Sequence, residues 1–436
     1  MKTIQRIRQE ILHRETTVVE TVQGFLDRIE QLEPQINAWV HVDEQGSLQQ
    51  AKRLQDQLDN GKAVGPLFGI PIGVKDIVDV KGLPVEAGTR YRQGTIAETD
   101  APVVERLRDL GAIILGKTVT TELACFDPPI TKNPWNLKHT PGGSSSGSAA
   151  AVATGMCAAA IGSQTGGSIT RPASYCGVAG WKPTFDQAPL RGVEPVTFHL
   201  DHVGPLARTV SDLVAFADLF IDSNSASDGS FSKRKPRIGV LRDFFLEECD
   251  DETRQVVDDV TKRLSDNGAQ VSDASLPDGF EGVHKMHWRI MAIEAAHFHG
   301  ADFQKHTTDF GPKVASLIVE GLESDLFDYT KALDHRKVFH HTVDNMWNDL
   351  DAILTPATPT AAPRDLSTTG DPRFNSPWSY AGIPTVSFPC GLTKTGLPMA
   401  VQLIGKRNCD RELLDLAAWC ETQIDFRTSS NEFGVL

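Results

Sequence analysis

The hydrophobic and polar positions of the first sixty residues follow the period of amphipathic helices. Residues 4–12 and 18–32 place apolar side chains three or four positions apart, and a more polar helix is expected to end near Asn60. Residues 65–80 break this period, because they combine β-branched and other apolar side chains with glycine. They predict a buried strand, and residues 101–118 predict a helix followed by a second strand.

The second half of the chain alternates strand and helix patterns in the same way. Residues 236–245 predict a strand and residues 250–271 a helix, which is the unit expected of a wound α/β sheet. A long, mostly helical stretch follows over residues 283–350. The remaining patterns are, in chain order, strands within 352–363 and 376–405 and a helix over 411–424.

These elements predict a protein of the α/β class. We expect one domain over residues 1–436, with its core at about 65–215 and a peripheral, mostly helical region at about 222–350. Residues 222–236 are polar and are expected to form a surface loop.

Composition and charge exclude several classes of function. The chain has 436 residues, of which 40% are apolar and 23% are charged, as in an ordinary globular protein. Its 57 acidic residues outnumber its 43 basic ones, which gives a formal charge of −14, and it has no basic run. We therefore expect no direct binding of nucleic acid or of anionic lipid.

No segment is expected to enter a membrane. The first twenty residues lack the apolar stretch of a signal peptide, and the most apolar run, residues 149–162, is only fourteen residues long. The seven cysteines are scattered and form no C-x-x-C pair, which favours reduced thiols. The expectation is a cytoplasmic protein.

Three familiar motifs occur without the context that they need. Residues 111–118 match the phosphate-binding pattern G-x-x-x-x-G-K-[ST], but the variable residues are Ala-Ile-Ile-Leu, which predict a buried strand. Residues 143–147 match the nucleophile elbow G-x-S-x-G, but Pro141 and polar residues precede them where a hydrophobic strand is required. His284 and His287 belong to no helix-spaced H-E-x-x-H, so no metal site is expected.

Residues 142–180 are extreme in composition, because glycine, alanine and serine make up 25 of the 39. The tripeptide Gly-Gly-Ser occurs at 142–144 and again at 166–168, and glycine pairs allow backbone conformations that aim several N–H groups at one point. A serine beside such groups could be a nucleophile next to its own oxyanion hole. A flexible linker is the alternative, but the alanine-rich run within the tract favours a tightly packed helix.

Lys75 stands in an apolar segment that is expected to be buried. An unpaired buried lysine is rare, and desolvation lowers its pKa, which a protein tolerates more readily at a working site than elsewhere. Two other interpretations stay open: the side chain reaches water at the end of a strand, or it pairs with Asp76.

Taken together, these segments resemble the amidase signature family. Three motifs carry the resemblance: Lys75 in GVKDIVDVKGLPVEAGT, Ser144 in PGGSSSGSAAAVA and Ser168 in GSQTGGSITRPASYCGVAGWKPT. It continues, in order, through residues 200–213, 351–363 and 381–405, and so covers nearly the whole chain. The resemblance implies a twisted mixed sheet of about eleven strands with helices on both sides, and it implies an enzyme that hydrolyses amides.

The resemblance also implies residue roles. Ser168 would be the nucleophile, Ser144 a relay serine that follows a cis peptide bond from Gly143, and Lys75 the general base. The reaction would pass through an acyl-enzyme and release ammonia or an amine, without a metal ion or cofactor. The oxyanion hole would consist of four backbone N–H groups, those of Thr165, Gly166, Gly167 and Ser168.

Three positions depart from the common family pattern. Thr170 stands where most members have arginine, Arg171 follows one position later, and Ser146 replaces a glycine; this resembles a branch of small stand-alone amidases that includes malonamidase. In that branch the arginine contacts a substrate carboxylate, so Arg171 is a candidate for substrate binding, with a structural ion pair as the alternative. Ser145 is a candidate for a hydrogen bond to the relay serine or for a helix N-cap, and Phe126 for a pocket wall or for core packing.

The main functional hypothesis is a stand-alone amidase that acts on a small amide, one that could carry a carboxylate. The alternatives are the glutaminase (A) subunit of a tRNA-dependent amidotransferase, which would bind tRNA only through a partner, and a carboxybiuret-hydrolase-like enzyme with a small partner subunit. A binding protein that kept the fold without catalysis is disfavoured, because Lys75, Ser144 and Ser168 are all present. A small-molecule amide is the expected partner, and a homodimer or a small partner subunit stays open.

Overall fold

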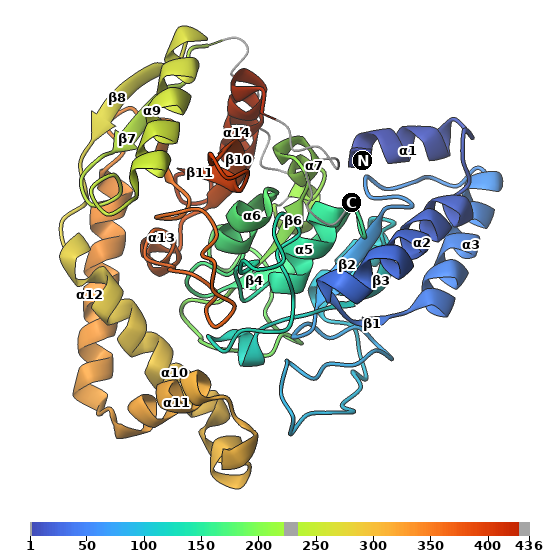
Figure 1. The fold of residues 1–436 in the computed structure, drawn as a ribbon, viewed down its shortest axis with the longest axis horizontal. Helices are drawn as coiled ribbons and strands as arrows, with labels where there is room; N and C mark the ends of the chain where they lie inside the picture. Colours follow the sequence, from blue (N-terminus) through green and yellow to red (C-terminus); the bar gives the residue numbers. More distant parts are fainter. Residues whose placement is uncertain (1, 222–233, 427–436) are drawn as a thin grey trace.

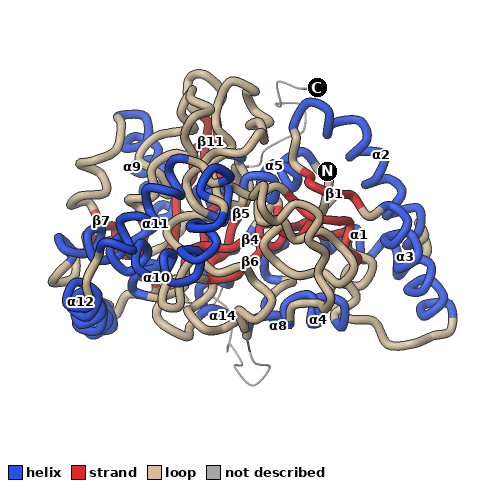
Figure 2. Tube along the Cα trace, turned by 90° about the horizontal axis from the view of Figure 1, so that it is seen from below, coloured by secondary structure: helices blue, strands red, loops and turns tan. Residues whose placement is uncertain are grey.

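A single mixed sheet forms the centre of the molecule in the computed structural model, which describes residues 2–221 and 234–426. Its eleven strands have the order β1-β3-β2-β4-β6-β5-β10-β11-β9-β7-β8, and helices flank the sheet (Figures 1 and 2). The α/β class and the sheet of eleven strands that the sequence predicted are therefore confirmed. The predicted loop 222–236 lies mostly outside the described residues.

The described strands and α-helices have these bounds. The strands are β1 Trp39–Val42, β2 Pro71–Lys75, β3 Ile113–Thr118, β4 Ala159–Gln164, β5 Ala179–Lys182, β6 His202–Ala207, β7 Arg237–Leu241, β8 Gln270–Ala274, β9 Ala352–Pro356, β10 Thr385–Leu392 and β11 Pro398–Ile404. The helices are α1 Ile4–Leu12, α2 Val18–Ile36, α3 Glu44–Asp59, α4 Pro102–Asp109, α5 Ser146–Thr154, α6 Thr170–Cys176, α7 Val210–Val214, α8 Ala217–Phe220, α9 Asp251–Asp266, α10 Val283–Lys305, α11 Pro312–Glu323, α12 Leu326–Asn345, α13 Ser376–Ala381 and α14 Asp410–Ile424.

The strong periodic patterns of the sequence correspond to elements of the structure. Helices α1, α2 and α3 account for the helical start, and α10, α11 and α12 for the long helical stretch (Figure 1). The strand β1 was missed, because its four residues separate two helices and are too few to show a period. The strand predicted over 65–80 is shorter: Pro71–Lys75 forms the strand β2, and beyond it Val78 makes an isolated bridge with Val193.

The region predicted to be peripheral and helical also contributes to the sheet. Strands β7 and β8 run parallel to each other, and β7 also pairs with β9. They extend the sheet at the edge opposite β1 (Figure 1). Because all eleven strands of the described residues lie in one sheet, we propose that residues 1–436 form a single domain.

The segment that matches the phosphate-binding pattern is the buried strand β3, as predicted. Gly116 has a φ of +151°, and a Cβ at this position would lie 2.1 Å from the carbonyl oxygen of His41 in β1. The glycine therefore allows two backbones to approach closely. Lys117 ends inside the protein, 3.1 Å from a carboxylate oxygen of Asp76.

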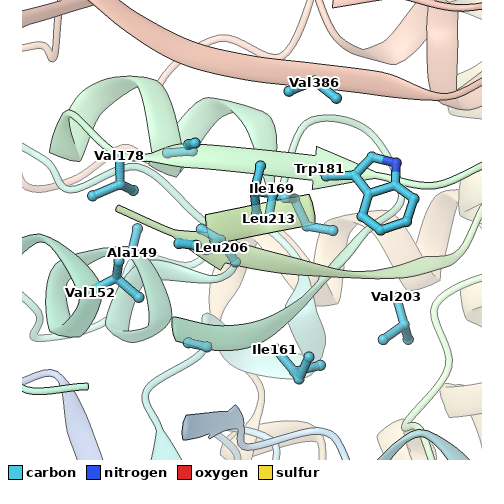
Figure 3. Close-up of a cluster of buried hydrophobic side chains, with 14 of the residues drawn as sticks. Ala149, Val152, Ile161, Ile169, Val178, Trp181, Val203, Leu206, Leu213 and Val386 are labelled. Carbon is cyan, nitrogen blue, oxygen red and sulfur yellow. The ribbon is translucent and has the colours of Figure 1, made fainter. Parts of the chain in front are cut away.

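Helix α5 packs its small side chains directly onto the sheet. Ala149 and Val152 of this helix lie among Ile161, Leu206 and Val178 in the core (Figure 3). A Cβ on Gly147 would lie 2.2 Å from the carbonyl oxygen of Ala38, so this turn of the helix touches the sheet backbone. The alanine-rich run therefore forms a tightly packed helix, as predicted, and its last part continues into β4.

This packing sets the ends of three elements beside one another. β2 and β4 are parallel neighbours, with Val74 opposite Ile161, so their carboxyl ends meet at one edge of the sheet. Lys75 ends β2, the turn 165–168 follows β4, and Ser144 and Ser145 precede α5. Among the described helices, none combines the length and the apolar character that crossing a bilayer requires.

Candidate active site

The side chain of Lys75 is buried and held by two serines. Its Nζ lies 2.6 Å from Oγ of Ser144 and 2.8 Å from Oγ of Ser163. Lys75 does not reach water and does not pair with Asp76, whose carboxylate contacts Lys117 instead. The structure therefore rules out the two other interpretations of Lys75.

Burial lowers the pKa of Lys75 to about 7, because the charged ammonium is desolvated, while the negative charge of Asp201 acts in the opposite direction. A fraction of the side chain is thus neutral near physiological pH and can accept a proton. Burial alone does not identify a base, since it also lowers the pKa of Lys182 to about 7. Lys182 donates to the carbonyl oxygen of Ile383 and has no serine partner among the described residues.

Ser168 lies in the turn between β4 and α6 and faces a cavity. The backbone N–H of Ser145 donates to the carbonyl oxygen of Ser168 over 3.2 Å, which joins this turn to the residue after Ser144. The Gly143–Ser144 peptide bond is cis, as the resemblance implied. Lys75, Ser144 and Ser168 thus come from three different segments of the chain that lie at one edge of the sheet.

The turn before Ser168 presents unpaired backbone N–H groups. Among the described residues, the N–H groups of Gly166, Gly167 and Ser168 have no protein acceptor. The carbonyl groups of the same turn are held from outside, since Thr165 O accepts from His287 Nε2 and Gly166 O accepts from Ser379 Oγ. A turn with fixed carbonyls and free N–H groups is suited to bind an oxyanion.

We expect Gly167→Ala to lower kcat/KM by about 10²–10³-fold, the effect of losing one oxyanion donor. An added Cβ would lie 2.6 Å from Oδ1 of Asn375, a buried side chain that is held by Ala357 O and Gln402 Oε1. The turn must therefore move. Gly166→Ala is the matched control, because its Cβ would meet no atom closer than 3.4 Å. Equal losses from both substitutions, measured by ammonia release, would contradict this explanation.

Asp201 is a buried carboxylate that the sequence reasoning did not select. It accepts hydrogen bonds from Thr165 Oγ1 at 2.6 Å and from the backbone N–H groups of Val196 and Thr197. Its pKa is raised by burial, which the hydrogen bonds oppose. Asp201 therefore fixes the first residue of the turn. Its place in LDHVGPL, one of the segments that carries the resemblance, was the available signal.

A cavity of about 180 Å³ opens in front of the turn. Two rings and four charged or polar side chains shape it, together with the turn itself: Phe126, Trp288, Arg171, Arg373, Asp371 and His287. The predicted site residues Arg171 and Phe126 are thus part of the wall, while the roles of Arg373, Asp371 and His287 were not foreseen. These three lie far from the glycine-rich tract in sequence, and only the fold brings them to it.

The guanidinium of Arg171 is buried, with 4% of the residue exposed. One terminal nitrogen donates to Gly143 O at 2.7 Å and to Thr369 Oγ1 at 3.2 Å, whereas Nε has no partner among the described residues. Arg171 forms no ion pair with a described acid, so the structural ion pair considered for it is absent there. The side chain therefore supports the Gly143–Ser144 peptide, and its Nε is buried without an acceptor among the described residues.

Ser145 is the N-cap residue of α5, as one interpretation placed it, but its side chain makes no capping hydrogen bond. Its hydroxyl instead donates to the carbonyl oxygen of Ser163 at 3.2 Å, and the residue does not line the cavity. The reason is that α5 is pressed against β4, so the side chain at the helix start points into the sheet. Ser163, the second partner of Lys75, was not foreseen.

The histidines serve as hydrogen-bonding side chains. His284 Nε2 bonds to Arg373 O at 2.9 Å, and His287 is kept neutral because burial lowers its pKa to about 4. Within residues 2–221 and 234–426, no group of three His, Cys, Asp or Glu side chains is placed to hold a metal ion.

Comparisons with known proteins agree on the class. A family model described as "Amidase" matches residues 20–414. One similar solved structure is a chain of an inhibitor-bound vestigial protein complex, described as revealing the evolutionary origins of an s-triazine catabolic enzyme. It matches with a TM-score of 0.90 and 28% identity, and the match covers 98% of this chain and 99% of that one. On the peptide amidase of Stenotrophomonas maltophilia the TM-score is 0.85 at 26% identity, with 98% of both chains covered.

Several curated relatives of the chain are A subunits of glutamyl-tRNA(Gln) amidotransferases. The chain is 32% identical to the A-subunit of the glutamyl-tRNA(Gln) amidotransferase of Nostoc sp. strain PCC 7120, over 96% of each chain. It is 35% identical to the protein of the same name from Lachnospira eligens, over 91% of this chain and 92% of that one. These relatives support the glutaminase-subunit alternative better than the stand-alone amidase that was the main hypothesis from the sequence.

The fold and the matches define the protein as an enzyme that hydrolyses the C–N bond of amides. The chain belongs to the amidase signature family, as the resemblance of its motifs indicated.

Proposed function

We propose that this chain hydrolyses the carboxamide of a small amino-acid amide, with glutamine as the leading candidate, and releases ammonia. The observation that carries the proposal is the set of charged side chains that line the cavity beside Ser168, namely Arg171, Arg373 and Asp371, of which Arg373 and Asp371 form an ion pair at 2.6 Å. Two guanidinium groups and one carboxylate suit the carboxylate and ammonium of an amino acid. A cavity of about 180 Å³ is smaller than sites for drug-sized ligands, which have about 300–1,000 Å³.

The proposed chemistry starts from neutral Lys75. Its Nζ accepts the hydroxyl proton of Ser144 while Ser144 Oγ accepts that of Ser168, and Ser168 Oγ attacks the amide carbon. The N–H groups of Thr165, Gly166, Gly167 and Ser168 hold the oxyanion. The proton returns through Ser144 to the leaving nitrogen, the C–N bond breaks, and ammonia departs from the acyl-enzyme. Water then attacks the ester by the same relay, which releases the acid and restores Ser168.

A stand-alone amidase that acts on a carboxylated amide is the second candidate. The position of Arg171 in the lining of the cavity favours it, because one arginine is enough to bind an amide such as malonamate. A carboxybiuret-hydrolase-like enzyme with a small partner subunit is supported by the similarity to the vestigial complex. Copurification from the native source tests for such a partner, with a homodimer as the other outcome. The free cysteines support a cytoplasmic location.

The deciding experiment measures ammonia released from glutamine, malonamate, carboxybiuret, and neutral aliphatic and aryl amides, with the Ser168→Ala variant as the blank. A preference for glutamine supports the leading proposal. A preference for malonamate or carboxybiuret transfers support to the corresponding alternative. A preference for neutral amides contradicts all three hypotheses, namely that the substrate is glutamine, malonamate or carboxybiuret.

Arg171→Ala is expected to reduce kcat/KM for carboxylated amides about 10- to 100-fold more than for neutral amides, because a charge-assisted hydrogen bond is lost. Comparing the two classes is necessary, since Arg171 also holds Gly143 O and its removal affects every substrate. Asp371→Asn separates the candidates: it should weaken glutamine, which has an ammonium group, and spare malonamate, which has none. Equal losses for all amides would make Arg171 purely structural.

A further inference from the structure

Helix α11 begins without a cap of its own. Its N-cap is Gly311, which has no side chain to accept a hydrogen bond, and Pro312 follows it. The first N–H groups of a helix need acceptors from elsewhere in the fold. In this protein the carboxylates of two residues far away in sequence, Glu122 and Asp127, supply them.

Three hydrogen bonds make this contact. Glu122 Oε2 accepts from Gly311 N at 2.8 Å, and Asp127 Oδ2 accepts from Lys313 N at 3.0 Å and from Val314 N at 2.9 Å. The positive end of the helix dipole favours carboxylates at this place. We call Glu122, Asp127 and the first turn of α11 the clamp.

Between the two clamp carboxylates lie residues 123–126, three of which, Ala124, Cys125 and Phe126, line the active-site cavity. Leu123 and Ala124 have φ values of +47° and +56°, which are costly for residues with a side chain. Such a backbone persists only where its surroundings hold it. The clamp holds it at both ends.

α11 also holds the ring that faces Phe126. Phe126 packs against Trp288 of α10, with 5.3 Å between ring centroids, and Trp288 Nε1 donates to Glu320 Oε2 of α11 at 2.9 Å. A Cβ at Gly321 would lie 2.0 Å from Ala292 O, so α10 and α11 are in close backbone contact. The two rings of the cavity wall are therefore anchored on one helix that does not itself line the cavity.

We propose that the clamp of α11 sets the width of the active-site cavity by holding Phe126 against Trp288, and thereby limits the size of the amide that the enzyme accepts. Glu122 and Asp127 are positioning residues in this proposal. It rests on amide hydrolysis in this cavity, as proposed above, and does not depend on which amide is the natural substrate.

Gly311→Ala tests the clamp from the helix side. Gly311 has a φ of −65°, which alanine adopts freely, but its Cβ would lie 2.6 Å from Asp127 Cγ and 2.6 Å from Glu122 Oε2. Both are ends of side chains, so they can turn away and leave the backbone in place. The substitution is expected to raise KM for a small amide about five- to tenfold, with kcat changed less than about twofold.

The double variant Glu122→Ala/Asp127→Ala removes the same contacts from the loop side and should give the same result. In both cases the ratio of kcat/KM between a small aliphatic amide and a bulky aryl amide should fall about tenfold, because a loosened wall discriminates less by size. Glu122→Gln/Asp127→Asn keeps an acceptor oxygen at each position and should restore wild-type values. Asp325→Ala, which removes the N-cap of the neighbouring helix α12, is the matched control and should change neither quantity.

Hydrogen exchange of the N–H groups of residues 121–127 gives a second readout that does not depend on activity. Faster exchange in Gly311→Ala, together with the reduced size discrimination, supports the proposal. Unchanged size discrimination in both clamp variants overturns it, whether or not exchange becomes faster. A wild-type protein that hydrolyses no amide of the panel contradicts the proposed function instead, which distinguishes the two failures.

Discussion

Ser168→Ala is expected to lower amide hydrolysis by about 10⁴-fold or more, because no other hydroxyl can form the acyl-enzyme in its place. The substitution removes one oxygen from a turn whose shape depends on other contacts: Asp201 holds Thr165, and Ser379 holds Gly166. The backbone of the oxyanion hole should therefore survive, and the loss should appear in kcat with KM little changed. Single-turnover ammonia release measures it.

Labelling by a small fluorophosphonate provides the control for this prediction. The wild-type protein should be modified at Ser168 and the variant should not, while circular dichroism of the two should be identical. Ser144→Ala should retain labelling at a reduced rate, since it loses the relay and keeps the nucleophile. Turnover by Ser168→Ala at more than about a hundredth of the wild-type rate would exclude Ser168 as the nucleophile.

Lys75→Met is expected to lower kcat/KM by about 10²–10⁴-fold, the usual contribution of a general base. Methionine is similar in length but cannot accept a proton from Ser144. Lys182→Met is the matched control, because Lys182 is equally buried and its pKa is also lowered to about 7. Its Nζ bonds to backbone carbonyl groups away from the cavity. A large loss of kcat/KM in Lys75→Met together with a small loss in Lys182→Met would show that the contact with Ser144, and not burial alone, makes Lys75 the base.

The pH dependence follows from the lowered pKa of Lys75. The reactive form is the neutral amine, so kcat/KM should rise about tenfold per pH unit below pH 7 and level off above about pH 8. The midpoint should be absent in the residual activity of Lys75→Met and unchanged in Lys182→Met. A flat profile from pH 6 to 9 would contradict a titrating Lys75.

Burial of Lys75 lowers the free energy of unfolding, and the pH dependence of that free energy tests this effect. The pKa of Lys75 is about 7 in the folded chain and 10.5 in the unfolded reference, a difference that corresponds to about 5 kcal/mol. Between these two pH values the unfolded chain binds the proton and the folded chain does not, so stability due to this group rises with pH. Below pH 7 the full cost is present. Lys75→Met should therefore be more stable than the wild type by about 1–3 kcal/mol at pH 6, less than the full value because two serines lose their partner.

The parts of the fold that sequence predicted are those with a clear local period. Helices α10 to α12 and strand β3 follow from patterns of apolar residues. The requirement for glycine at position 116, in contrast, is explained only by the tertiary structure, in which the backbone of His41 lies against it. The strand β1 was not predictable, since four residues exist as a strand because β3 offers an edge to pair with. Pairing between segments so far apart in the chain leaves no local signal.

The candidate site shows the same division. Lys75, Ser144 and Ser168 were found because glycine pairs and a lysine among apolar residues are chemically unusual. The ion pair between Asp76 and Lys117 was not found, because it joins the residue after β2 to the strand β3. Lys75 and Asp76 do not pair with each other, since successive side chains on an extended chain point to opposite sides: Lys75 faces Ser144, and Asp76 faces Lys117. Ser145 was expected to serve the relay or cap α5, and it is the N-cap residue, but its hydroxyl bonds to Ser163.

The sequence by itself determined the α/β class, the family, and the three residues on which the proposed chemistry depends, since each of these is carried by residue types and spacings within short segments. Tertiary structure decided which groups surround them: Ser163 and Asp201 around the lysine and the turn, Arg373 and Asp371 in the cavity, and the clamp of Glu122 and Asp127 on α11. These contacts join segments up to about two hundred residues apart. They depend on the packing of the sheet and its helices, which no local pattern records.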